Sequence, residues 1–482
     1  MKFVADLHLH SKYSRAVSPD MVLSKMADWA KMKGINVIAC GDFTHPFWFD
    51  QLKNELEDTG KGLYQLKTIN KQQETEVYFL LSCEISSIYS QGGRGRRIHN
   101  LVFFPSLKSV EKFNDALLKR GANLRSDGRP IVGMSARDLA QIAFETDEKA
   151  LVVPAHVWTP WFSLFGSMSG FDSVEECFGD MAKYIYGIET GLSSDPAMNW
   201  RVEDLDSRAV LSFSDAHSLE KMGREATVFE ANEISYESIY EAITLSPRGP
   251  VTSFPPASAR SKLKPKGNKK DNVELRAVGS PSTGATPRVA FTIEFHPEEG
   301  KYHYTGHRDC NFSQNVTESA KNGDICPVCK RKLTIGVVHR VEDLATRNTK
   351  HETRNINGVN WNFADGMTRS PFVSLVPLAE IIAEVEGSAI KTKKVFDQYS
   401  ALVHGIGSEF SVLLKAGLDE LRQYASAKVV EGIEKVRRGD IKIDPGYDGK
   451  FGKVQIWQDE QSADRKESKG DDEEAQLNLF AG

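Results

Sequence analysis

The sequence of 482 residues lacks any long run of apolar residues. No stretch approaches the roughly 18 consecutive apolar residues that a membrane-spanning helix needs. The segment Met1–Asp6 leads directly into a polar histidine motif rather than into the apolar part of a secretion signal. With 40% hydrophobic and 26% charged residues, the chain also differs from collagen-like and wholly disordered proteins. We therefore expect a cytoplasmic protein of two to four domains with no membrane partner.

The chain has no excess of basic residues over acidic ones. The chain has 61 Lys and Arg against 66 Asp and Glu, a formal net charge of -5. This deficit is concentrated near the end of the chain, where residues 459–474 hold eight acidic and three basic residues. The remainder is close to neutral, so local patches rather than total charge must decide whether the protein binds an anion such as a nucleic acid.

Cysteine is scarce, and three of the six cysteines lie close together in the sequence. Two pairs, His307 with Cys310 and Cys326 with Cys329, are each separated by two residues, which is the spacing of structural zinc ligands. Four nitrogen and sulfur ligands leave no open position, so one structural zinc ion is expected here. The alternative is a redox-active Cys-x-x-Cys, which would not explain the first pair.

The first 250 residues alternate short β-rich runs with segments of helical periodicity, the pattern of a parallel α/β sheet or barrel. The seven predicted strands are 2–9, 35–41, 77–83, 98–104, 151–157, 186–190 and 210–214.

The rest of the chain changes character several times. Five units are predicted: a metal-dependent phosphoesterase barrel (1–254), a basic Ser/Pro/Gly-rich linker (255–288), a zinc ribbon (289–345), a helical DNA-binding domain (346–457) and a disordered acidic tail (458–482).

Histidines and carboxylates recur at or just past the ends of the predicted strands. In a closed parallel barrel those ends converge on one face, where imidazoles and carboxylates from distant segments can bind divalent metal ions. Two or three ions, with Zn, Mn or Mg as candidates, are expected, because the set is larger than one ion can use. The candidate ligands are His8, His10, Asp42, His45, Glu84, His99, His156, Asp215 and His217.

The order of these motifs resembles that of the polymerase and histidinol phosphatase (PHP) family. The resemblance rests on Asp6-Leu-His-Leu-His-Ser11, Pro154-Ala-His156 and Ser214-Asp-Ala-His217 together with the intervening ligands. It implies a distorted seven-stranded β/α barrel with a multinuclear metal centre that hydrolyses phosphoesters. The second motif reads Gly41-Asp-Phe-Thr-His45, so either Asp42 or His45 could complete the ligand set.

Two features near these motifs indicate a large anionic substrate. A basic loop, residues 91–97, should overhang the metal site, where Arg96 and Arg97 are candidates to stabilise charge on a phosphate. The segment after His156 is rich in aromatic residues, and its Trp158, Trp161 and Phe162 could stack on a base taken out of the duplex. A hydrophobic lid packed on the barrel explains the same aromatic residues equally well.

Taken with the zinc motif and with Asp444-Pro-Gly-Tyr-Asp-Gly449, the sequence is similar to the endonuclease Q family. That resemblance implies a bacterial DNA repair endonuclease that nicks on the 5′ side of deaminated bases (uracil, hypoxanthine, xanthine) and at abasic sites. It implies catalytic roles for Asp215 and His217. The terminal peptide Gln476, Leu477, Leu479 and Phe480 resembles the motif by which bacterial repair proteins bind the sliding clamp, so a nucleoid-associated protein is expected. The alternatives are a PHP-type small-molecule phosphatase and a non-catalytic DNA or clamp adaptor.

Overall fold

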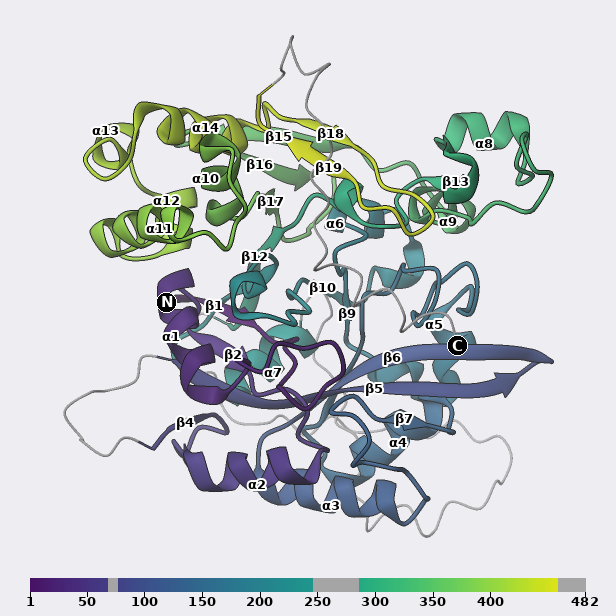
Figure 1. The fold of residues 1–482 in the computed structure, drawn as a ribbon. Coiled ribbons are helices and arrows are strands. Elements are labelled where there is room, and N and C mark those ends of the chain that lie inside the picture. The colour runs from purple at the N-terminus through teal and green to yellow at the C-terminus, as the bar shows by residue number, and fades with distance from the viewer. Residues whose placement is uncertain (68–76, 246–285, 458–482) are drawn as a thin grey trace.

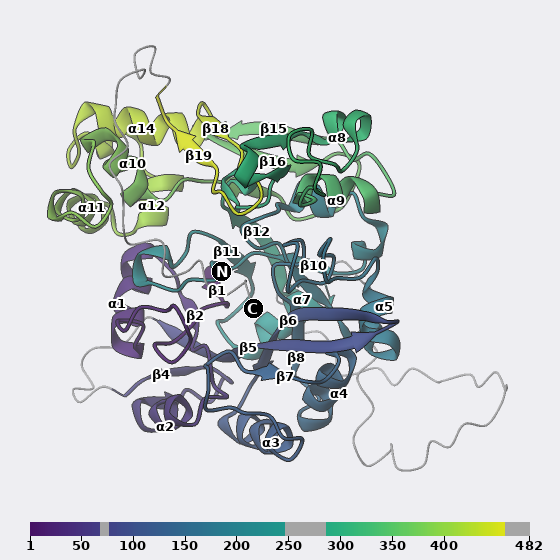
Figure 2. The same cartoon turned by 45° about the vertical axis from the view of Figure 1, so that its right-hand side comes forward.

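The computed structural model describes residues 1–67, 77–245 and 286–457. Within this part of the chain it is a mixed α/β protein, with a large sheet at its centre and a group of helices at one end (Figures 1 and 2). No helix in the described residues is long and apolar enough to span a membrane. The acidic tail with its terminal peptide and nearly all of the basic linker lie outside the described residues.

The strands are short except for one long pair. They are β1 (Lys2–Asp6), β2 (Val37–Ala39), β3 (Leu56–Asp58), β4 (Tyr64–Leu66), β5 (Tyr78–Gln91), β6 (Arg94–Phe104), β7 (Ile131–Val132), β8 (Leu151–Pro154), β9 (Gly187–Glu189), β10 (Ala209–Leu211), β11 (Ala226–Glu230), β12 (Arg288–Glu294), β13 (Thr305–His307), β14 (Phe312–Gln314), β15 (His351–Ile356), β16 (Val359–Ala364), β17 (Phe372–Ser374), β18 (Lys442–Asp444) and β19 (Lys453–Gln455).

The helices cover the sheet and build the C-terminal group. The α-helices are α1 (Leu23–Lys33), α2 (Pro46–Glu55), α3 (Leu107–Leu118), α4 (Ala136–Thr146), α5 (Val174–Phe178), α6 (Pro196–Asn199), α7 (Tyr236–Leu245), α8 (Val316–Asn322), α9 (Val337–Leu344), α10 (Leu378–Glu386), α11 (Lys393–Ile406), α12 (Glu409–Leu414), α13 (Leu418–Leu421) and α14 (Ala427–Arg438). Short 3₁₀ turns are η1 (Gly179–Tyr184), η2 (Glu203–Leu205), η3 (Leu219–Lys221), η5 (Pro297–Glu299) and η6 (Arg308–Cys310).

The first βαβ unit forms as its sequence predicts. Strand β1 pairs in parallel with β2, and β2 pairs in parallel with β5. Helix α1 connects β1 to β2 and ends at Gly34, whose φ of 86° is the left-handed conformation that a side chain disfavours. Its apolar face, which includes Met26 and Ala30, is buried against the sheet.

The large sheet is mixed, and the prediction of an all-parallel barrel was wrong on this point. Strand β6 runs antiparallel to both β5 and β8, and β11 runs antiparallel to β1. The cause for β6 is local: Gly92 and Gly93, both with positive φ, close a tight turn after β5, and so short a connection can only reverse the chain. The long β5–β6 hairpin extends beyond the rest of the sheet (Figure 1).

The described strands do not join into one closed ring of backbone ladders. Strands β9 and β10 form a separate parallel pair beside the thirteen-stranded sheet. Side chains connect the gap between β10 and β11, where Ser212 N donates to Thr227 Oγ1 at 2.9 Å and Thr227 Oγ1 donates back to Ser212 O at 3.0 Å. We call this gap the β10–β11 seam.

The large sheet continues past the end of the predicted barrel. Strand β12, from the predicted zinc ribbon, pairs antiparallel with β11 and in parallel with β17. Strand β17 pairs with β16, and β16 with β15, all from the predicted helical domain. One sheet therefore runs through three of the predicted units.

The C-terminal helices contact the N-terminal half through α1. Lys33 Nζ at the end of α1 lies 2.7 Å from Glu409 Oε2 at the start of α12, and both side chains are almost fully buried. Glu409 also accepts hydrogen bonds from the Tyr399 hydroxyl at 2.8 Å and from Leu378 N at 3.0 Å. One carboxylate thus connects α1, α10, α11 and α12.

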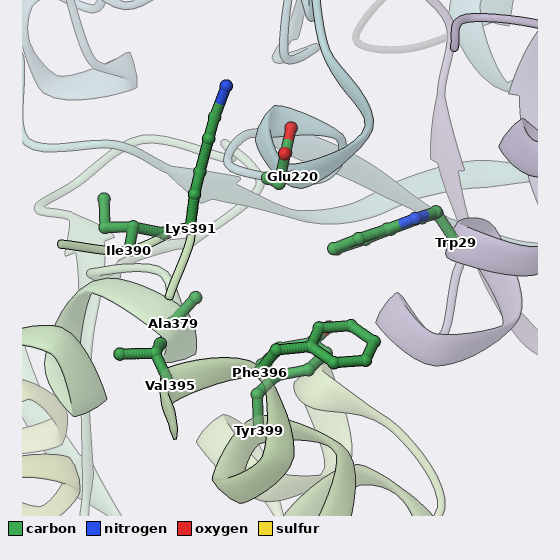
Figure 3. A pocket seen from close by; sticks show the side chains of 8 residues that line it. All are labelled: Trp29, Glu220, Ala379, Ile390, Lys391, Val395, Phe396 and Tyr399. Carbon is green, nitrogen blue, oxygen red and sulfur yellow. The ribbon is translucent and has the colours of Figure 1, made fainter. Parts of the chain in front are cut away.

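A pocket of about 170 Å³ lies beside this ion pair, between α1 and helices α10 and α11 (Figure 3). Trp29, Phe396 and Tyr399 supply aromatic walls, and Glu220 and Lys391 lie at its polar side. None of the predicted metal ligands lines it. The pocket therefore belongs to the contact between the two halves of the chain and is separate from the site described next.

Candidate metal centre

The structure brings seven of the nine predicted ligands together. They lie in or just beyond β1, β5, β6, β8 and β10, and they form three groups in which one ligand atom per residue lies within 4.8 Å of the others. The groups are His8, His10 and Glu84; His10, Asp215 and His217; and Glu84, His99 and His156. Because His10 and Glu84 are each shared by two groups, the arrangement is one continuous site.

Glu84 lies at the middle of this site and is buried. Its Oε1 is 2.6 Å from His99 Nδ1 and 3.0 Å from His156 Nε2, and its Oε2 is 3.4 Å from His10 Nε2. Burial alone would raise the pKa of Glu84, but its interactions with His99 and Arg129 hold that pKa well below its usual range. Glu84 is therefore ionised, as a carboxylate that binds a metal ion must be.

The donor set fits divalent metal ions. His8 has its Nδ1 2.9 Å from Glu189 Oε1, whereas its buried Nε2 makes no hydrogen bond. That free nitrogen lies 3.4 Å from Asp215 Oδ1 and 3.7 Å from Glu84 Oε2. One ring nitrogen held by a carboxylate and the other directed at ligand oxygens is the usual arrangement of a metal-binding histidine.

Asp42 and His45, the two remaining predicted ligands, belong to none of the three groups. Asp42 accepts hydrogen bonds from Ser11 N at 2.6 Å and Ser14 Oγ at 2.9 Å, and its Oδ1 lies 3.1 Å from His10 Nδ1. It is placed to orient His10. His45 stacks on Tyr13 with ring centroids 4.4 Å apart, away from the shared carboxylate.

Glu189 is a site residue that the sequence reasoning missed. Besides holding His8, it accepts a hydrogen bond from His156 N at 2.7 Å through its second oxygen. It ends β9 just as carboxylates and histidines end or follow the other strands, so the same positional signal could have identified it. Asp6 was missed too: it accepts hydrogen bonds from Ser214 N and Gly223 N, and it thereby fixes the segment that carries Asp215.

The backbone at the site is strained. Asp42, His156 and Asp215 have φ values of 49°, 31° and 47°, in the left-handed region that non-glycine residues rarely adopt. Close backbone approaches accompany them: a Cβ on Gly191 would lie 2.4 Å from His156 Cβ. Residues held in such conformations are concentrated at functional sites, where the surrounding structure imposes them.

The structure directs the two candidate arginines away from the carboxylates. The Arg96 guanidinium donates to Gly170 O and lies 4.0 Å from the centroid of the Phe171 ring. Arg97 lies over the Phe162 ring at 5.4 Å. Both belong to strand β6, so the expected flexible basic loop is a β-hairpin.

The arginine that reaches the site is Arg129, which the sequence did not single out. Its Nη1 lies 3.1 Å from Glu84 Oε2, and its side chain is 16% exposed. Gly128 allows this approach, because a Cβ there would lie 2.5 Å from the Asp42 carboxylate. No motif marks this segment in the sequence, so only the fold reveals it.

The three candidate aromatic residues lie in different surroundings. Trp158 is buried, packs on Phe165 with centroids 4.8 Å apart and donates its indole N–H to Asn199 Oδ1, so it is a core residue. Trp161 packs edge-on against Tyr302 at 5.5 Å. Phe162 lies against His99 at 4.8 Å. Of the three, Phe162 is the one in contact with a candidate ligand.

The second predicted metal cluster also assembles. The ligand atoms of His307, Cys310, Cys326 and Cys329 lie within 4.8 Å of one another. The Cys326 turn is closed by hydrogen bonds from Cys326 N to Arg331 O and from Lys330 N to Cys326 O. Burial would raise the pKa of the Cys326 thiol, but the backbone N–H groups of Cys329 and Val328 lower it to about 6. A four-ligand set with a thiolate fits a structural zinc ion.

Two family models match parts of the chain. The model described as PHP-associated matches residues 210–245, which begin in β10 and include Asp215 and His217. The model of the MJ0043 C-terminal domain matches residues 377–440, which span α10 to α14.

Two curated relatives are similar in sequence. Protein MJ0043 of Methanocaldococcus jannaschii is 29% identical over 304 residues, 62% of this chain and 31% of that protein. The chain therefore spans about a third of the length of this relative. Protein YqxK of Bacillus subtilis is 27% identical over 466 residues, 94% of this chain and 99% of that protein.

Two solved structures resemble nearly the whole chain. The lesion-specific endonuclease PfuEndoQ from Pyrococcus furiosus has a TM-score of 0.73 at 28% identity, over 95% of this chain and 96% of that one. Endonuclease Q in complex with a 27-mer duplex substrate carrying an abasic lesion at its active site has a TM-score of 0.74 at 28% identity, over 95% and 97%. The chain is thus similar to endonuclease Q across almost the full length of both chains.

Proposed function

We propose that this protein is a metal-dependent DNA endonuclease that nicks the phosphodiester on the 5′ side of deaminated bases and at abasic sites. The observation that carries the proposal is the continuous site of seven histidines and carboxylates in a chain that resembles a lesion-bound endonuclease Q. Uracil, hypoxanthine and xanthine are the proposed bases. A phosphodiester carries charged oxygens on both sides of the reacting phosphorus, which a site of several cations suits.

The residues proposed to hold two or three divalent ions are His8, His10, Glu84, His99, His156, Asp215 and His217. When bound, such ions supply a reactive water and neutralise charge on the phosphoryl oxygens. Zn²⁺, Mn²⁺ and Mg²⁺ all accept ligands of these types, and the histidine nitrogens favour Zn²⁺ and Mn²⁺ over Mg²⁺.

The protein residues around the ligands fix their geometry. Glu189 holds the His8 ring through Nδ1 and the backbone of His156, so one carboxylate sets two ligands from different strands. Asp42 holds the His10 ring through its Nδ1 atom. Burial lowers the pKa of His217 to about 4 and that of His99 to about 4, so both imidazoles are neutral near pH 7 and can serve as ligands.

The substrate is proposed to enter past Phe162 and Arg97. The Phe162 ring, next to His99, offers a stacking surface for an extruded base. In the same segment, Trp161 packs against Tyr302 and Trp158 packs against Phe165, and both contacts would hold the segment in place. Arg97 and Arg96 lie on β6 where the flanking DNA backbone would pass, and Arg129 supplies positive charge beside the ligands.

The remaining parts have proposed supporting roles. A zinc ion held by His307, Cys310, Cys326 and Cys329 would stabilise the small β13–β14 unit. The helices of residues 346–457 are proposed to contact the DNA. The terminal peptide 476–480, which lies outside the described residues, is proposed to bind a bacterial sliding clamp in the nucleoid.

A nicking assay tests the proposal. The purified protein is incubated with Mg²⁺ or Mn²⁺ and end-labelled duplexes carrying one uracil, one hypoxanthine, one xanthine, one abasic site or no lesion. We expect a single nick 5′ to each lesion and none on the undamaged duplex. Asp215→Asn should abolish it, whereas the matched control Asp419→Asn, at a side chain 96% exposed, should not.

Two outcomes would contradict the proposal. Release of phosphate from free phosphomonoesters without nicking of any duplex would indicate a small-molecule phosphatase. Lesion binding without nicking, in a protein shown to contain its metal ions, would indicate a DNA or clamp adaptor.

A further inference from the structure

Two fully buried carboxylates lie beside each other at the end of the β11–β12 ladder, next to the β10–β11 seam and apart from the metal centre. Glu225 immediately precedes β11, and Glu294 ends β12; both residues have 0% exposure. The Glu225 Oε1 atom accepts a hydrogen bond from Phe295 N at 3.3 Å, which brings this carboxylate to the end of β12 where Glu294 lies. Neither carboxylate belongs to a candidate metal-binding group described above.

No cationic side chain in the described residues forms an ion pair with either carboxylate. Arg224, the neighbour of Glu225, directs its guanidinium to the carbonyl oxygens of Ser214 and Asp215 at 2.9 and 3.3 Å. Two buried negative charges without a partner are far too costly to persist, so protons or a bound cation must neutralise them.

The groups around the pair are oxygens. Ser212 Oγ donates to Glu294 Oε1, and Thr190 Oγ1 lies 3.3 Å from Glu294 Oε2. Thr292 lies two residues before Glu294 on β12, so its side chain is on the same face of the strand, and its hydroxyl lies against the Glu294 carboxylate. Glu225 Oε2 is buried and makes no hydrogen bond. The seam thus contains two carboxylates and three hydroxyls, and one of the carboxylate oxygens has no partner.

We propose that Glu225, Glu294 and the hydroxyls of Thr190, Ser212 and Thr292 form a binding site for one hard divalent cation, Mg²⁺ or Ca²⁺, at the β10–β11 seam. Oxygen ligands alone select such ions over Zn²⁺, which prefers nitrogen and sulfur. A charge of +2 neutralises the two carboxylates, and the unpartnered Glu225 Oε2 atom gains the partner that burial demands. The proposal does not depend on the nuclease function.

The position of this seam site gives the cation a structural role. Strands β9–β10 and β11–β12 share no backbone ladder across the seam. An ion bound by residues that follow β9 and β10, precede β11 and lie in β12 would therefore join the two sheets. Thr190 directly follows Glu189, which holds His8 and His156. A cation bound at the seam site would therefore restrict the movement of the Glu189 carboxylate, which positions His8 and His156.

Metal content and thermal unfolding test the proposal. The full-length protein is stripped with a chelator, dialysed against Ca²⁺ or Mg²⁺, and compared with Glu225→Gln/Glu294→Gln. We expect the variant to bind one ion fewer per chain and to lose the rise in melting temperature that Ca²⁺ gives the wild type. Glu299→Gln, which alters another buried carboxylate not assigned to the seam site, is the matched control and should retain both properties.

Equal ion content and an equal response to Ca²⁺ in a folded double variant would overturn the proposal and show that protons neutralise the pair. If the double variant does not fold, wild-type crystals soaked in Tb³⁺ provide the second measurement. An anomalous peak within bonding distance of Glu225 Oε2 and Glu294 supports the site, and the absence of such a peak refutes it.

Discussion

The buried ion pair of Lys33 and Glu409 predicts that the helices of the C-terminal group and the N-terminal sheet unfold together. The perturbation is Glu409→Ala. Their side chains are 2% and 4% exposed, and the Lys33 ammonium also lies within about 6 Å of the rings of Trp29 and Tyr399. Removal of the carboxylate leaves an ammonium ion buried without a partner.

The size of the effect follows from three lost interactions. Removing one partner of a buried ion pair costs roughly 3–5 kcal/mol, because the charge of the other partner stays buried without compensation. The Tyr399 hydroxyl and Leu378 N each lose an acceptor, at roughly 1 kcal/mol or more. We therefore expect the free energy of unfolding to fall by about 5–7 kcal/mol. Lys33→Met/Glu409→Leu, which removes both charges, should cost much less.

Urea denaturation followed by tryptophan fluorescence and circular dichroism measures this effect. The matched control is Lys435→Met, which breaks an exposed pair with Asp440 and should cost at most about 1 kcal/mol. An effect of Glu409→Ala no larger than that of the control would refute the reasoning. So would a double variant as unstable as Glu409→Ala, since the cost would then not come from an unpaired charge.

Three further predictions follow from the sites. Cys326→Ser, or zinc removal by a chelator, should unfold the β13–β14 unit and its ligand turns (305–332) locally, seen as loss of amide protection in hydrogen exchange there. Unchanged protection would argue against a structural zinc ion. Burial raises the pKa of Glu294 to about 8. When a chelator has removed divalent cations, protonation of Glu294 stabilises the fold fully below about pH 4.5, and this stabilisation is lost as the pH rises through 8. Melting temperatures should fall over that range, and less so in Glu294→Gln; an equal fall in both proteins would contradict this assignment. Phe162→Ala should reduce kcat/KM on a uracil duplex about tenfold more than on an abasic duplex, because stacking is worth roughly 1–3 kcal/mol per base; an equal loss on both duplexes would exclude a stacking role.

The sequence was most informative where chemistry-bearing residues fall at strand ends. Seven of the nine predicted ligands lie together: five follow the ends of β1, β8 and β10, whereas Glu84 and His99 lie in the middle of the longer strands β5 and β6. The clustering of His307, Cys310, Cys326 and Cys329 was predictable because their spacing is a local property of two short turns. The resemblance to endonuclease Q was recognised from these motifs together with Asp444-Pro-Gly-Tyr-Asp-Gly449.

The errors concern contacts between segments that are distant in the sequence. Arg129 reaches Glu84 across 45 residues, and nothing near it in the chain signals the contact. The second motif left Asp42 and His45 as alternative ligands, and the sequence did not reveal that Asp42 accepts hydrogen bonds from Ser11 and Ser14 beside His10. Strand β6 was predicted to be parallel because alternating patterns do not reveal strand direction, which here depends on a two-glycine turn.

The passage of one sheet from β11 through β12 to β17 limits how this protein can be divided into fragments. A fragment that stops at residue 254, the end of the predicted barrel, would retain β11 but lose its neighbour β12. The unpaired N–H and C=O groups of β11 would then form an open edge bearing Val228 and Phe229, both of which are buried in the intact chain. Such edges recruit strands from other molecules. The shortened chain should therefore self-associate when expressed alone, and adding the remaining residues as a separate polypeptide should restore a soluble complex.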